Sequence, residues 1–419
     1  MYFSNKVQNL NIIYNIAIGL TELLLKFIAL FNAKIKLGVD GRSQTFSILK
    51  NAILSSDYCI WFHCASLGEY EQGLPVFKDI KKLYKNHKIV LTFFSPSGYE
   101  IRKNTDVADV VVYLPIDTKQ NAKRFLDIVN PKLTVFVKYD IWPNYLNELK
   151  KRQQRAILIS ALFRENQSYF KWYGNFMRNK LFAFEHIFTQ DLKSKELLKK
   201  INYHNTTVSG DTRFDRVASQ LDQDNTLDFI SKFKNNQLCF VAGSTWPEDE
   251  KILVDYINTT TENIKFIITP HNIKTVHIQK LKDSILKKSI LFSEKESVYL
   301  PNFQVLIIDT IGLLSKIYSY ANIAYVGGAM GSTGLHNILE PAVFGIPIII
   351  GNNHEKFPEA NLMIKNAGVL EIENTEDFKL IMSRLTQDQE FLTTLGEKNS
   401  NFIKKNTGAV IQITNYLRI

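Results

Sequence analysis

The chain has 419 residues, of which 45% are apolar and 22% are charged. These proportions are ordinary for a globular protein, and the length exceeds one ordinary core, so we expect two domains of roughly 200 residues each. The net charge of +10 favours an anionic partner, but no recognised nucleic-acid motif accompanies it, so nucleic acid is not expected. The three cysteines (Cys59, Cys64 and Cys239) lack metal-ligand spacing, and Cys59 and Cys64 lie in one apolar run, which indicates buried thiols in a reducing compartment.

The most apolar long segment, residues 10–31, lies near the N-terminus. At about 100° per residue, its polar side chains fall on one narrow stripe of a helix that is otherwise apolar: Asn11, Asn15, Glu22 and Lys26. About 20 residues are enough to span a bilayer. The ionisable pair near the middle of the segment favours instead a helix that lies in the interface or docks on protein.

Basic residues follow this helix at once, as expected beside the anionic headgroups on the cytoplasmic side of a membrane: Lys34, Lys36 and Arg42. An N-terminal core helix is the alternative interpretation. We predict membrane attachment, with the bulk of the protein in the cytoplasm.

From Tyr58 onward, short apolar runs alternate with helical segments, which predicts parallel sheets covered on both faces. The expected strands are 58–62, 88–94, 110–113, 133–137, 156–159 and 186–189, then 238–242, 264–268, 305–308, 323–326 and 346–350. A polar stretch without strand character separates the two series. The predicted organisation is an apolar helix with a basic linker (1–42), an α/β domain (43–218), a linker (219–236) and a second α/β domain (237–419).

Polar or glycine residues repeatedly follow the carboxyl ends of these expected strands, where open α/β sheets bind ligands. Two consecutive α/β domains would create a cleft between them. Neither domain carries a G-x-G-x-x-G dinucleotide fingerprint or a Walker A sequence.

The run 327–341 follows one of these strands and contains four glycines within eight residues. Glycine lets the backbone approach a ligand closely, so Gly328 and Gly334 are candidate binding positions. If a helix opens directly after the loop, Asn337 and Glu340 are i, i+3 neighbours that could offer an amide and a carboxylate to a sugar diol. The alternative is a glycine turn that closes a βα unit, with Glu340 as a solvated first-turn residue.

Ser244 and Thr245 follow the end of another expected strand, so their backbone N–H groups and hydroxyls could contact a phosphate. Alternatively, Thr245 caps the next helix, with Glu248 three residues later completing a capping box. Both interpretations can hold at once. His271 follows the next expected strand and is a further candidate for contacts to a ligand.

Glu69 follows a small-residue turn between an expected strand and a helix. A carboxylate there can act on a ligand, or it can interact with the helix dipole. Glu71, two residues later, is expected to be solvated. Asp140 precedes a helix expected to begin near Pro143, where a carboxylate could serve a ligand site or cap the helix.

Arg213 offers a bidentate donor suited to phosphate or carboxylate, and its alternative is an ion pair with Asp211 or Asp215. No cluster of His, Cys and carboxylate residues in the sequence has metal-site spacing. We therefore expect no catalytic metal, and nothing in the sequence calls for another cofactor.

Seven strings, in order along the chain, resemble the motifs of the Kdo transferases, which attach 3-deoxy-D-manno-octulosonic acid (Kdo) to the lipid A precursor of Gram-negative bacteria. They are 61–69 ending in Gly68-Glu69, 113–117 with 125–132, Asp140-x-Trp142-Pro143-Asn144, 209–215 with Arg213-Phe214-Asp215, 242–245, 309–312 and 327–341 with His336-Asn337-x-x-Glu340. The resemblance reaches from the N-terminal helix to about Ile372. Asp140 stands where the family more often has Glu, and His271 follows Pro270 directly, without the arginine common in the family.

The resemblance implies two Rossmann-like domains facing across a cleft, the GT-B architecture of nucleotide-sugar glycosyltransferases. It implies that the C-terminal domain binds CMP-Kdo and that the N-terminal domain faces the acylated disaccharide lipid A precursor, in an inverting transfer at the cytoplasmic face of the inner membrane. Glu69 matches the catalytic base, and Asp140 is assigned to the same catalytic centre. The implied substrate-binding residues are Arg213, Ser244, Thr245, His271, Gly328, Gly334, Asn337 and Glu340.

Two other classes of function compete with this interpretation. One is a different GT-B nucleotide-sugar transferase or a nucleotide-sugar epimerase, and the other is a non-catalytic, membrane-associated protein that binds a nucleotide sugar. The resemblance does not determine the number of Kdo units added, the acylation preference, the oligomeric state, or whether the first helix spans the membrane.

Overall fold

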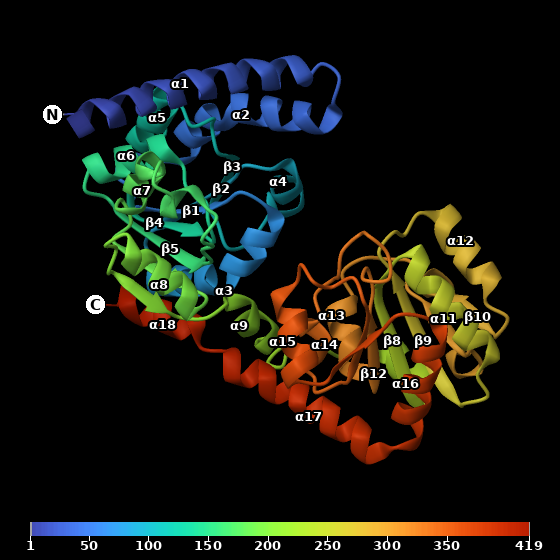
Figure 1. Cartoon of the computed structure of the whole chain (residues 1–419). Coiled ribbons are helices and arrows are strands. Elements are labelled where there is room, and N and C mark those ends of the chain that lie inside the picture. The colour runs from blue at the N-terminus through green and yellow to red at the C-terminus, as the bar shows by residue number, and fades with distance from the viewer. Residues whose placement is uncertain (1, 419) are drawn as a thin grey trace. The chain divides into compact units, whose positions relative to one another are not determined.

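The computed structural model describes residues 2–418, which divide into two compact units. The first unit runs to Arg216 and includes the C-terminal segment from Thr407, and the second is Val217–Asn406. Each unit is built on a sheet of seven parallel strands with helices packed against it (Figure 1). The predicted fold class, two Rossmann-like α/β domains with an N-terminal apolar helix, is confirmed.

The first sheet has the strand order β3-β2-β1-β4-β5-β6-β7. Both of its faces are buried: in β1, Cys59 and Trp61 join one apolar core, while Ile60 and Phe62 join the other. This double burial explains why the strands are continuous apolar runs. The strands are β1 (Cys59–Cys64), β2 (Lys88–Phe93), β3 (Val110–Tyr113), β4 (Pro131–Val137), β5 (Arg155–Ala161), β6 (His186–Thr189) and β7 (Thr206–Val208).

Ten helices accompany this sheet in the part of the chain that the structure describes. They are α1 (Tyr2–Ile28), α2 (Ala33–Ala52), α3 (Leu67–Leu83), α4 (Pro96–Arg102), α5 (Lys119–Val129), α6 (Pro143–Lys151), α7 (Asn175–Leu181), α8 (Leu192–Lys200), α9 (Thr212–Ala218) and α18 (Ala409–Leu417). The basic linker expected before residue 43 is instead the first half of α2. The side chain of Asn32 caps this helix by accepting from the Ile35 N–H at 3.1 Å, and Arg42 turns inward and donates to the Leu114 carbonyl at 3.2 Å.

The C-terminal helix α18 corrects the predicted domain boundaries, because residues 407–419 belong to the first unit and not to the second. Its apolar side chains Val410, Ile413 and Leu417 are buried in the core on one face of the first sheet. The carboxylate of Asp215 accepts from the backbone N–H of Gly408 at 2.8 Å, which fixes the start of the helix.

The polar stripe of α1 docks on the first unit. The Tyr14 hydroxyl donates to Asp117 at 2.7 Å, and the Asn15 side chain accepts from the Asn144 amide at 3.0 Å. Burial raises the pKa of Asp117 to about 7, although its hydrogen-bond donors oppose that shift. Through these contacts, the N-terminal half of α1 docks on the protein, which was one of the predicted alternatives.

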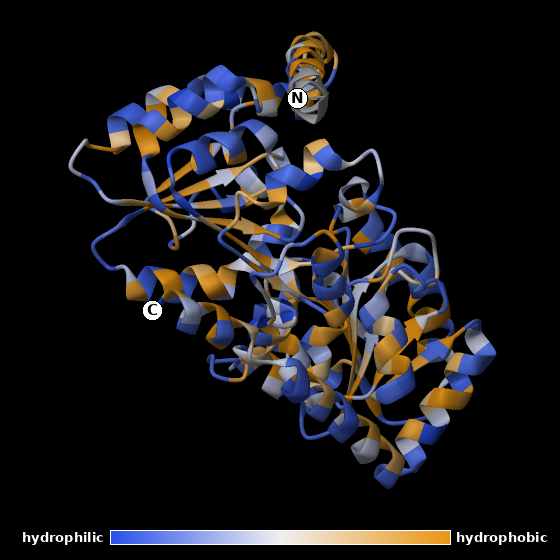
Figure 2. Ribbon diagram, turned by 60° about the vertical axis from the view of Figure 1, so that its left-hand side comes forward, coloured by the Kyte–Doolittle hydropathy of each residue, from blue (hydrophilic) through white to orange (hydrophobic). Residues whose placement is uncertain are grey.

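The opposite side of α1 is apolar and exposed, and α1 lies beside α2 (Figures 1 and 2). Its exposed large side chains include Ile12, Ile13, Ile16, Leu20, Leu23, Leu24 and Phe27. The segment Leu10–Ile28 is long and apolar enough to cross a membrane. This apolar segment contains one ion pair, between Glu22 and Lys26, with a nitrogen–oxygen distance of 2.9 Å.

The second sheet has the strand order β10-β11-β9-β8-β12-β13-β14. Its strands are β8 (Leu238–Thr245), β9 (Ile264–Pro270), β10 (Ser289–Leu291), β11 (Val305–Ile307), β12 (Ile323–Val326), β13 (Ile348–Gly351) and β14 (Val369–Ile372). Its α-helices are α10 (Asp228–Lys234), α11 (Pro247–Thr259), α12 (Thr275–Ser284), α13 (Leu314–Ile317), α14 (Leu339–Ala342), α15 (Pro358–Asn366), α16 (Thr375–Gln387) and α17 (Gln389–Asn406). The linker expected at 219–236 is therefore partly folded, since α10 buries Ile230 and Phe233 in the second unit.

Both sheets reverse their strand order beside the first strand of the unit. In the first unit the reversal lies between β1 and β4, and in the second between β8 and β12. Ligands of open α/β sheets bind at the carboxyl ends of the strands that flank such a reversal. The two candidate clusters described next occupy these positions.

Candidate active site

Two buried carboxylates lie at the strand reversal of the first unit. Glu69 stands in the first turn of α3, directly after β1, and Asp140 follows β4; they are 7% and 8% exposed. Glu69 Oε2 accepts from the Ala65 N–H at 2.5 Å and from the Ser66 N–H at 3.2 Å. Asp140 Oδ2 accepts from the same Ala65 N–H at 2.9 Å. One backbone donor therefore holds both acidic side chains together.

The environment of Glu69 favours its protonated form. Burial, followed by the charge of Asp140, raises the pKa of Glu69 to about 8, and the N–H donors of Ala65 and Ser66 only partly oppose this. Two carboxylates so close cannot both ionise readily. A carboxylate with a pKa near the working pH is well suited to general acid–base catalysis.

Glu69 also satisfies the helix-dipole interpretation, because its bond to the Ser66 N–H caps the start of α3. The prediction for Glu71 is wrong: its side chain is only 14% exposed. It forms ion pairs with Arg102 and Arg216 at 2.6 and 2.9 Å. Two arginines from neighbouring elements reach it, so it is not a free solvated residue.

Asp140 does not cap the helix that follows it. The helix α6 begins at Pro143, and its first N–H groups belong to Asn144 and Tyr145. Asp117 accepts from both of them, at 3.0 and 3.1 Å, so the capping carboxylate comes from another part of the chain. Asp140 Oδ2 instead accepts from the Ala65 N–H and lies 3.3 Å from His63 Nε2.

Arg213 forms the ion pair that the sequence analysis offered as its alternative. Its guanidinium Nε and Nη2 both donate to Asp211 Oδ2 at 2.8 Å. Asp211 is held in turn by the Gln72 amide, which donates to its other oxygen at 2.8 Å. The Arg213 side chain is 36% exposed, and its contact with a phosphate or a sugar carboxylate stays a prediction.

The glycine loop of the second unit has a backbone that requires glycine. Gly328 and Gly334 have φ angles of +98° and +101°, which L side chains rarely adopt. A Cβ on Gly328 would lie 2.1 Å from the Gly334 carbonyl oxygen, and the Gly334 N–H donates to the Gly328 carbonyl at 3.1 Å. The loop is thus closed on itself and fixed in shape.

Asp249 anchors this loop and is not among the predicted site residues. Its carboxylate is fully buried and accepts from the Gly328 N–H at 2.8 Å, the Trp246 N–H at 2.9 Å and the Tyr325 hydroxyl at 2.7 Å. It stands three residues after the N-cap of α11, and an acidic residue at that position is the sequence pattern from which its capping role could have been predicted. The side chain connects the start of α11 to the loop after β12.

The proposed capping box of Thr245 with Glu248 is wrong, because α11 starts one residue later and Asp249 takes the capping position. The Thr245 hydroxyl instead donates to Glu250 Oε1 at 3.0 Å. Ser244 has a φ of +54°, an unusual conformation for a non-glycine residue. Such strain at a strand end is frequent at ligand sites.

Three aromatic rings gather beside the loop: those of Trp246, His271 and His336. The Trp246 and His271 rings stack with their centres 4.5 Å apart, and His271 lies 4.6 Å from His336. Trp246 Nε1 donates to His336 Nε2 at 3.1 Å. Burial, followed by the proximity of His271, lowers the pKa of His336 to about 4, so His336 is neutral and accepts this bond. Of these three residues, only His271 is a predicted site residue.

Asn337 and Glu340 lie side by side, as the i, i+3 spacing suggested. The Asn337 amide donates to Glu340 Oε1 at 3.1 Å, and the Ser315 hydroxyl donates to Glu340 Oε2 at 2.9 Å. The helix α14 begins at Leu339, later than expected, and the side-chain Oδ1 of Asn337 accepts from the Leu339 N–H at 3.2 Å. The pair is therefore held in place before any ligand arrives.

Within residues 2–418, no group of three or more His, Cys, Asp and Glu side chains could hold a metal ion. The expectation of catalysis without a metal stays a prediction.

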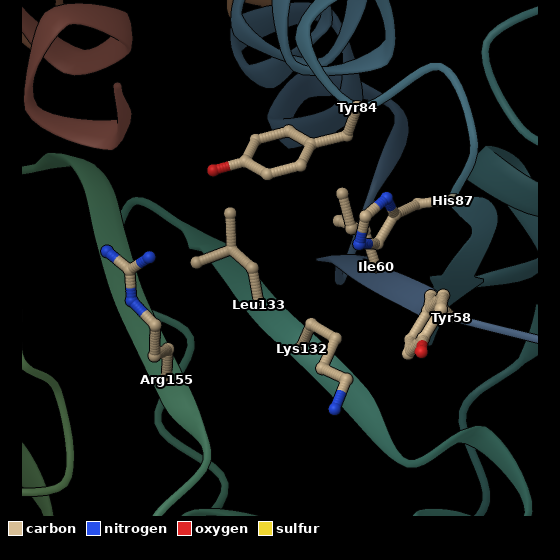
Figure 3. Close-up of a pocket in the computed structure, with 7 residues that line it drawn as sticks. All are labelled: Tyr58, Ile60, Tyr84, His87, Lys132, Leu133 and Arg155. Carbon is tan, nitrogen blue, oxygen red and sulfur yellow. The ribbon is translucent and has the colours of Figure 1, made fainter. Parts of the chain in front are cut away.

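A cavity of about 400 Å³ lies at the opposite edge of the first sheet, where the strands begin (Figure 3). It is lined by Tyr58, Ile60, Tyr84, His87, Lys132, Leu133 and Arg155. Arg155 is bound to Glu185 at 2.9 Å, and the Lys132 ammonium lies over the Tyr58 ring. None of the predicted site residues reaches this cavity.

The family model and the two relatives described here carry the same name. Residues 40–216 match the sequence model of the family described as 3-deoxy-D-manno-octulosonic-acid transferase (kdotransferase). The chain is 26% identical over 414 residues to the 3-deoxy-D-manno-octulosonic acid transferase of Haemophilus influenzae, covering 94% of this chain and 95% of that protein. It is 27% identical over 349 residues to the transferase of that name from Aquifex aeolicus, covering 81% and 88%.

Solved structures show the same fold at low identity. A UDP-GlcNAc 2-epimerase from Neisseria meningitidis matches with a TM-score of 0.59 and 13% identity, covering 87% of this chain and 100% of that one. A glycosyltransferase from Rickettsia africae matches with a TM-score of 0.54 and 12% identity, covering 87% and 97%. The fold is therefore common to epimerases and transferases, whereas the sequence matches concern transferases. The matches over most of the chain support the 3-deoxy-D-manno-octulosonic acid transferase family, and with it a glycosyltransferase of lipopolysaccharide assembly.

Proposed function

We propose that this protein transfers Kdo from CMP-Kdo to the acylated disaccharide precursor of lipid A, with inversion at the anomeric carbon. The observation that carries the proposal is the buried pair of Glu69 and Asp140 at the strand reversal of the first unit. An acceptor hydroxyl is a poor nucleophile until a base removes its proton. Glu69, with its pKa raised to about 8, is the group suited to that task.

In the proposed reaction, the acceptor hydroxyl gives its proton to the Glu69 carboxylate while its oxygen attacks the anomeric carbon of Kdo. The bond from that carbon to the phosphate oxygen of CMP breaks, and CMP leaves with the bonding electron pair. The developing negative charge on the phosphate needs fixed donors. The Arg213 guanidinium is our candidate for that charge or for the Kdo carboxylate, which it would bind in competition with Asp211.

The second unit supplies the proposed donor site. Asn337 and Glu340 would bind the ribose hydroxyls, because an amide and a carboxylate held together offer both a donor and acceptors. The rings of Trp246 and His271 are stacked on each other, and a cytosine would extend this stack. Ser244 and Thr245 would lie near the phosphate, because they end β8, and Gly328 and Gly334 would shape the loop that follows β12 beside them.

We further propose that the protein works at the cytoplasmic face of the inner membrane. The exposed apolar side of α1 suits the lipid interior, and the net charge of +10 suits anionic headgroups and an anionic glycolipid. Because Tyr14 and Asn15 bind the first unit, we favour a helix that lies along the membrane over one that crosses it.

Incubation of the purified protein with CMP-Kdo and a tetra-acylated disaccharide precursor tests the proposal, with mass spectrometry of the lipid product. The expected result is a lipid heavier by one or more Kdo residues, which also counts the units added. UDP-N-acetylglucosamine serves as the control donor and should give no product. Absence of any Kdo-bearing lipid, from protein that binds vesicles and is folded, would reject the proposed substrates.

A further inference from the structure

His63, which no role above uses, lies beneath the carboxylate pair. It is the fifth residue of β1 and has no exposed surface. Its ring packs edge-on against Phe136 and Trp142, with ring centres 5.7 and 5.6 Å away. Its Nδ1 lies 2.7 Å from the Thr92 hydroxyl on the neighbouring strand β2. A histidine so enclosed has a fixed orientation.

The hydrogen bonds around Thr92 determine which nitrogen of His63 carries the proton. Trp61 Nε1, which can only donate, gives its proton to the Thr92 oxygen at 2.8 Å. The Thr92 hydroxyl proton then has two acceptors, His63 Nδ1 at 2.7 Å and the Phe62 carbonyl at 3.3 Å. The shorter contact favours His63 Nδ1 as the acceptor, so the ring proton is on Nε2.

The Nε2 atom of His63 faces Asp140. It lies 3.3 Å from Asp140 Oδ2, a contact that is not aligned as a hydrogen bond, and this buried nitrogen has no hydrogen-bond partner. The same Asp140 oxygen accepts from the Ala65 N–H, which also holds Glu69. A continuous chain of contacts therefore runs from Trp61 through Thr92 and His63 to the carboxylate pair.

We propose that His63 is a positioning residue: its Nε2–H faces Asp140, keeps that carboxylate ionised, and so leaves the shared proton with Glu69. This inference rests on the proposed function, because it concerns how the base is prepared. An ionised Asp140 beside Glu69 makes Glu69 a stronger base, which takes the acceptor proton more readily. Without the Nε2–H, Asp140 takes the shared proton, and Glu69 ionises at a lower pH as a weaker base.

The other titratable groups near the pair do not share this proton. Burial, with the charges of the two carboxylates, raises the pKa of Cys64 well above its ordinary value. The pKa of Tyr139 is also raised by burial and by the pair, and that of Tyr169 is raised to about 12. These groups are neutral near pH 7. Glu71, on the same helix as Glu69, is held by two arginines.

Two variants of His63 test the proposal by the pH dependence of Kdo transfer. His63→Met keeps a similar volume and removes the N–H, whereas His63→Gln retains an amide N–H of similar reach. For His63→Met, we expect the acidic limb of the kcat/KM profile to move down by about one pH unit and the plateau to fall about tenfold, with little change in KM. His63→Gln should keep the wild-type limb. A wild-type limb in a folded His63→Met variant would overturn the proposal, because packing damage alone lowers the rate without moving the limb.

A second measurement covers the case in which His63→Met does not fold, and it needs no variant. The tautomer can be read without activity. In wild-type protein with ¹⁵N-labelled histidine, the His63 ring should show a protonated Nε2 and an unprotonated Nδ1, and the opposite tautomer would overturn the inference. Failure of the proposed function has a different signature, because the wild-type protein would then transfer no Kdo at any pH.

Discussion

The two units use one sheet topology in opposite ways at the same position. At the reversal of the first sheet, two buried carboxylates share one backbone N–H, and the environment leaves a proton on Glu69. At the reversal of the second sheet, a glycine loop is closed by its own hydrogen bonds and anchored by Asp249, while Asn337 and Glu340 already bind each other. In the first site, two acidic side chains repel each other when both are ionised. In the second, the polar groups of the loop already have hydrogen-bond partners. Under the proposed function, the first site performs the chemistry and the second binds the donor, so substitutions in the first should lower the rate and substitutions in the second should weaken the affinity.

The largest expected effect is that of Glu69→Ala on the rate. Loss of a general base costs about 10²–10⁴-fold in rate. The rate of Kdo transfer should therefore fall by that factor. The affinity for CMP-Kdo, measured by calorimetry, should stay at the wild-type value. Near-normal turnover would show that Glu69 is not the base. An equal loss of CMP-Kdo affinity would show that the first site also binds the donor.

The pH dependence of the wild-type enzyme should follow the pKa of Glu69. This pKa is raised to about 8, so Glu69 is protonated below that pH and cannot accept a proton from the substrate. The value of kcat/KM should rise about tenfold per pH unit up to pH 8 and then level off. A profile that is flat between pH 6 and pH 8 would mean that another group is the base.

Gly328→Ala tests the fixed shape of the loop in the second unit. The new Cβ would meet the Gly334 carbonyl oxygen at a φ of +98°, and the combined strain should cost about 3 kcal/mol in stability of that unit or in CMP-Kdo affinity. Gly331→Ala is the control in the same loop, because its Cβ would meet only the flexible Glu248 side chain. Equal effects of the two variants on thermal unfolding and on calorimetric affinity would contradict a special role for Gly328.

Glu340→Ala should have the smallest of these effects. Its loss leaves the Ser315 hydroxyl and the Asn337 amide without this partner, and CMP-Kdo binding should weaken by about 1–3 kcal/mol. Calorimetry measures the affinity, and Glu340→Gln, which keeps an acceptor oxygen, should lose less. An unchanged CMP-Kdo affinity in Glu340→Ala would show that this carboxylate does not bind the nucleotide.

Much of the fold could be predicted from the sequence, because strands buried on both faces are continuous apolar runs. The three strands that were missed are short: β7 and β10 have three residues each, and β14 has four, with the charged Glu371 among them. The place of α18 could not be predicted either. Its apolar face fits any core, and only the three-dimensional structure shows that it returns to the first unit.

The candidate sites divide in the same way. Residues within a few positions of one another, such as Asn337 and Glu340, could be paired from their spacing. The meeting of Glu69 with Asp140, and of Asp249 with Gly328, joins residues about 70 to 80 positions apart in the chain. Their contacts depend on which strands become neighbours, and one sequence does not reveal that. The roles of these residues remain predictions until the variants are measured.

The return of α18 to the first unit has a consequence for biosynthesis. A ribosome makes residues 217–406 after most of the first unit and before α18, so the second unit can complete its core while the first still lacks Val410, Ile413 and Leu417. An apolar face that includes part of α3 and of the first sheet stays uncovered until the last residues emerge. A nascent chain paused before residue 409 would therefore carry a finished second unit and an incomplete first one, which makes that interval the period of greatest exposure to aggregation and to proteases.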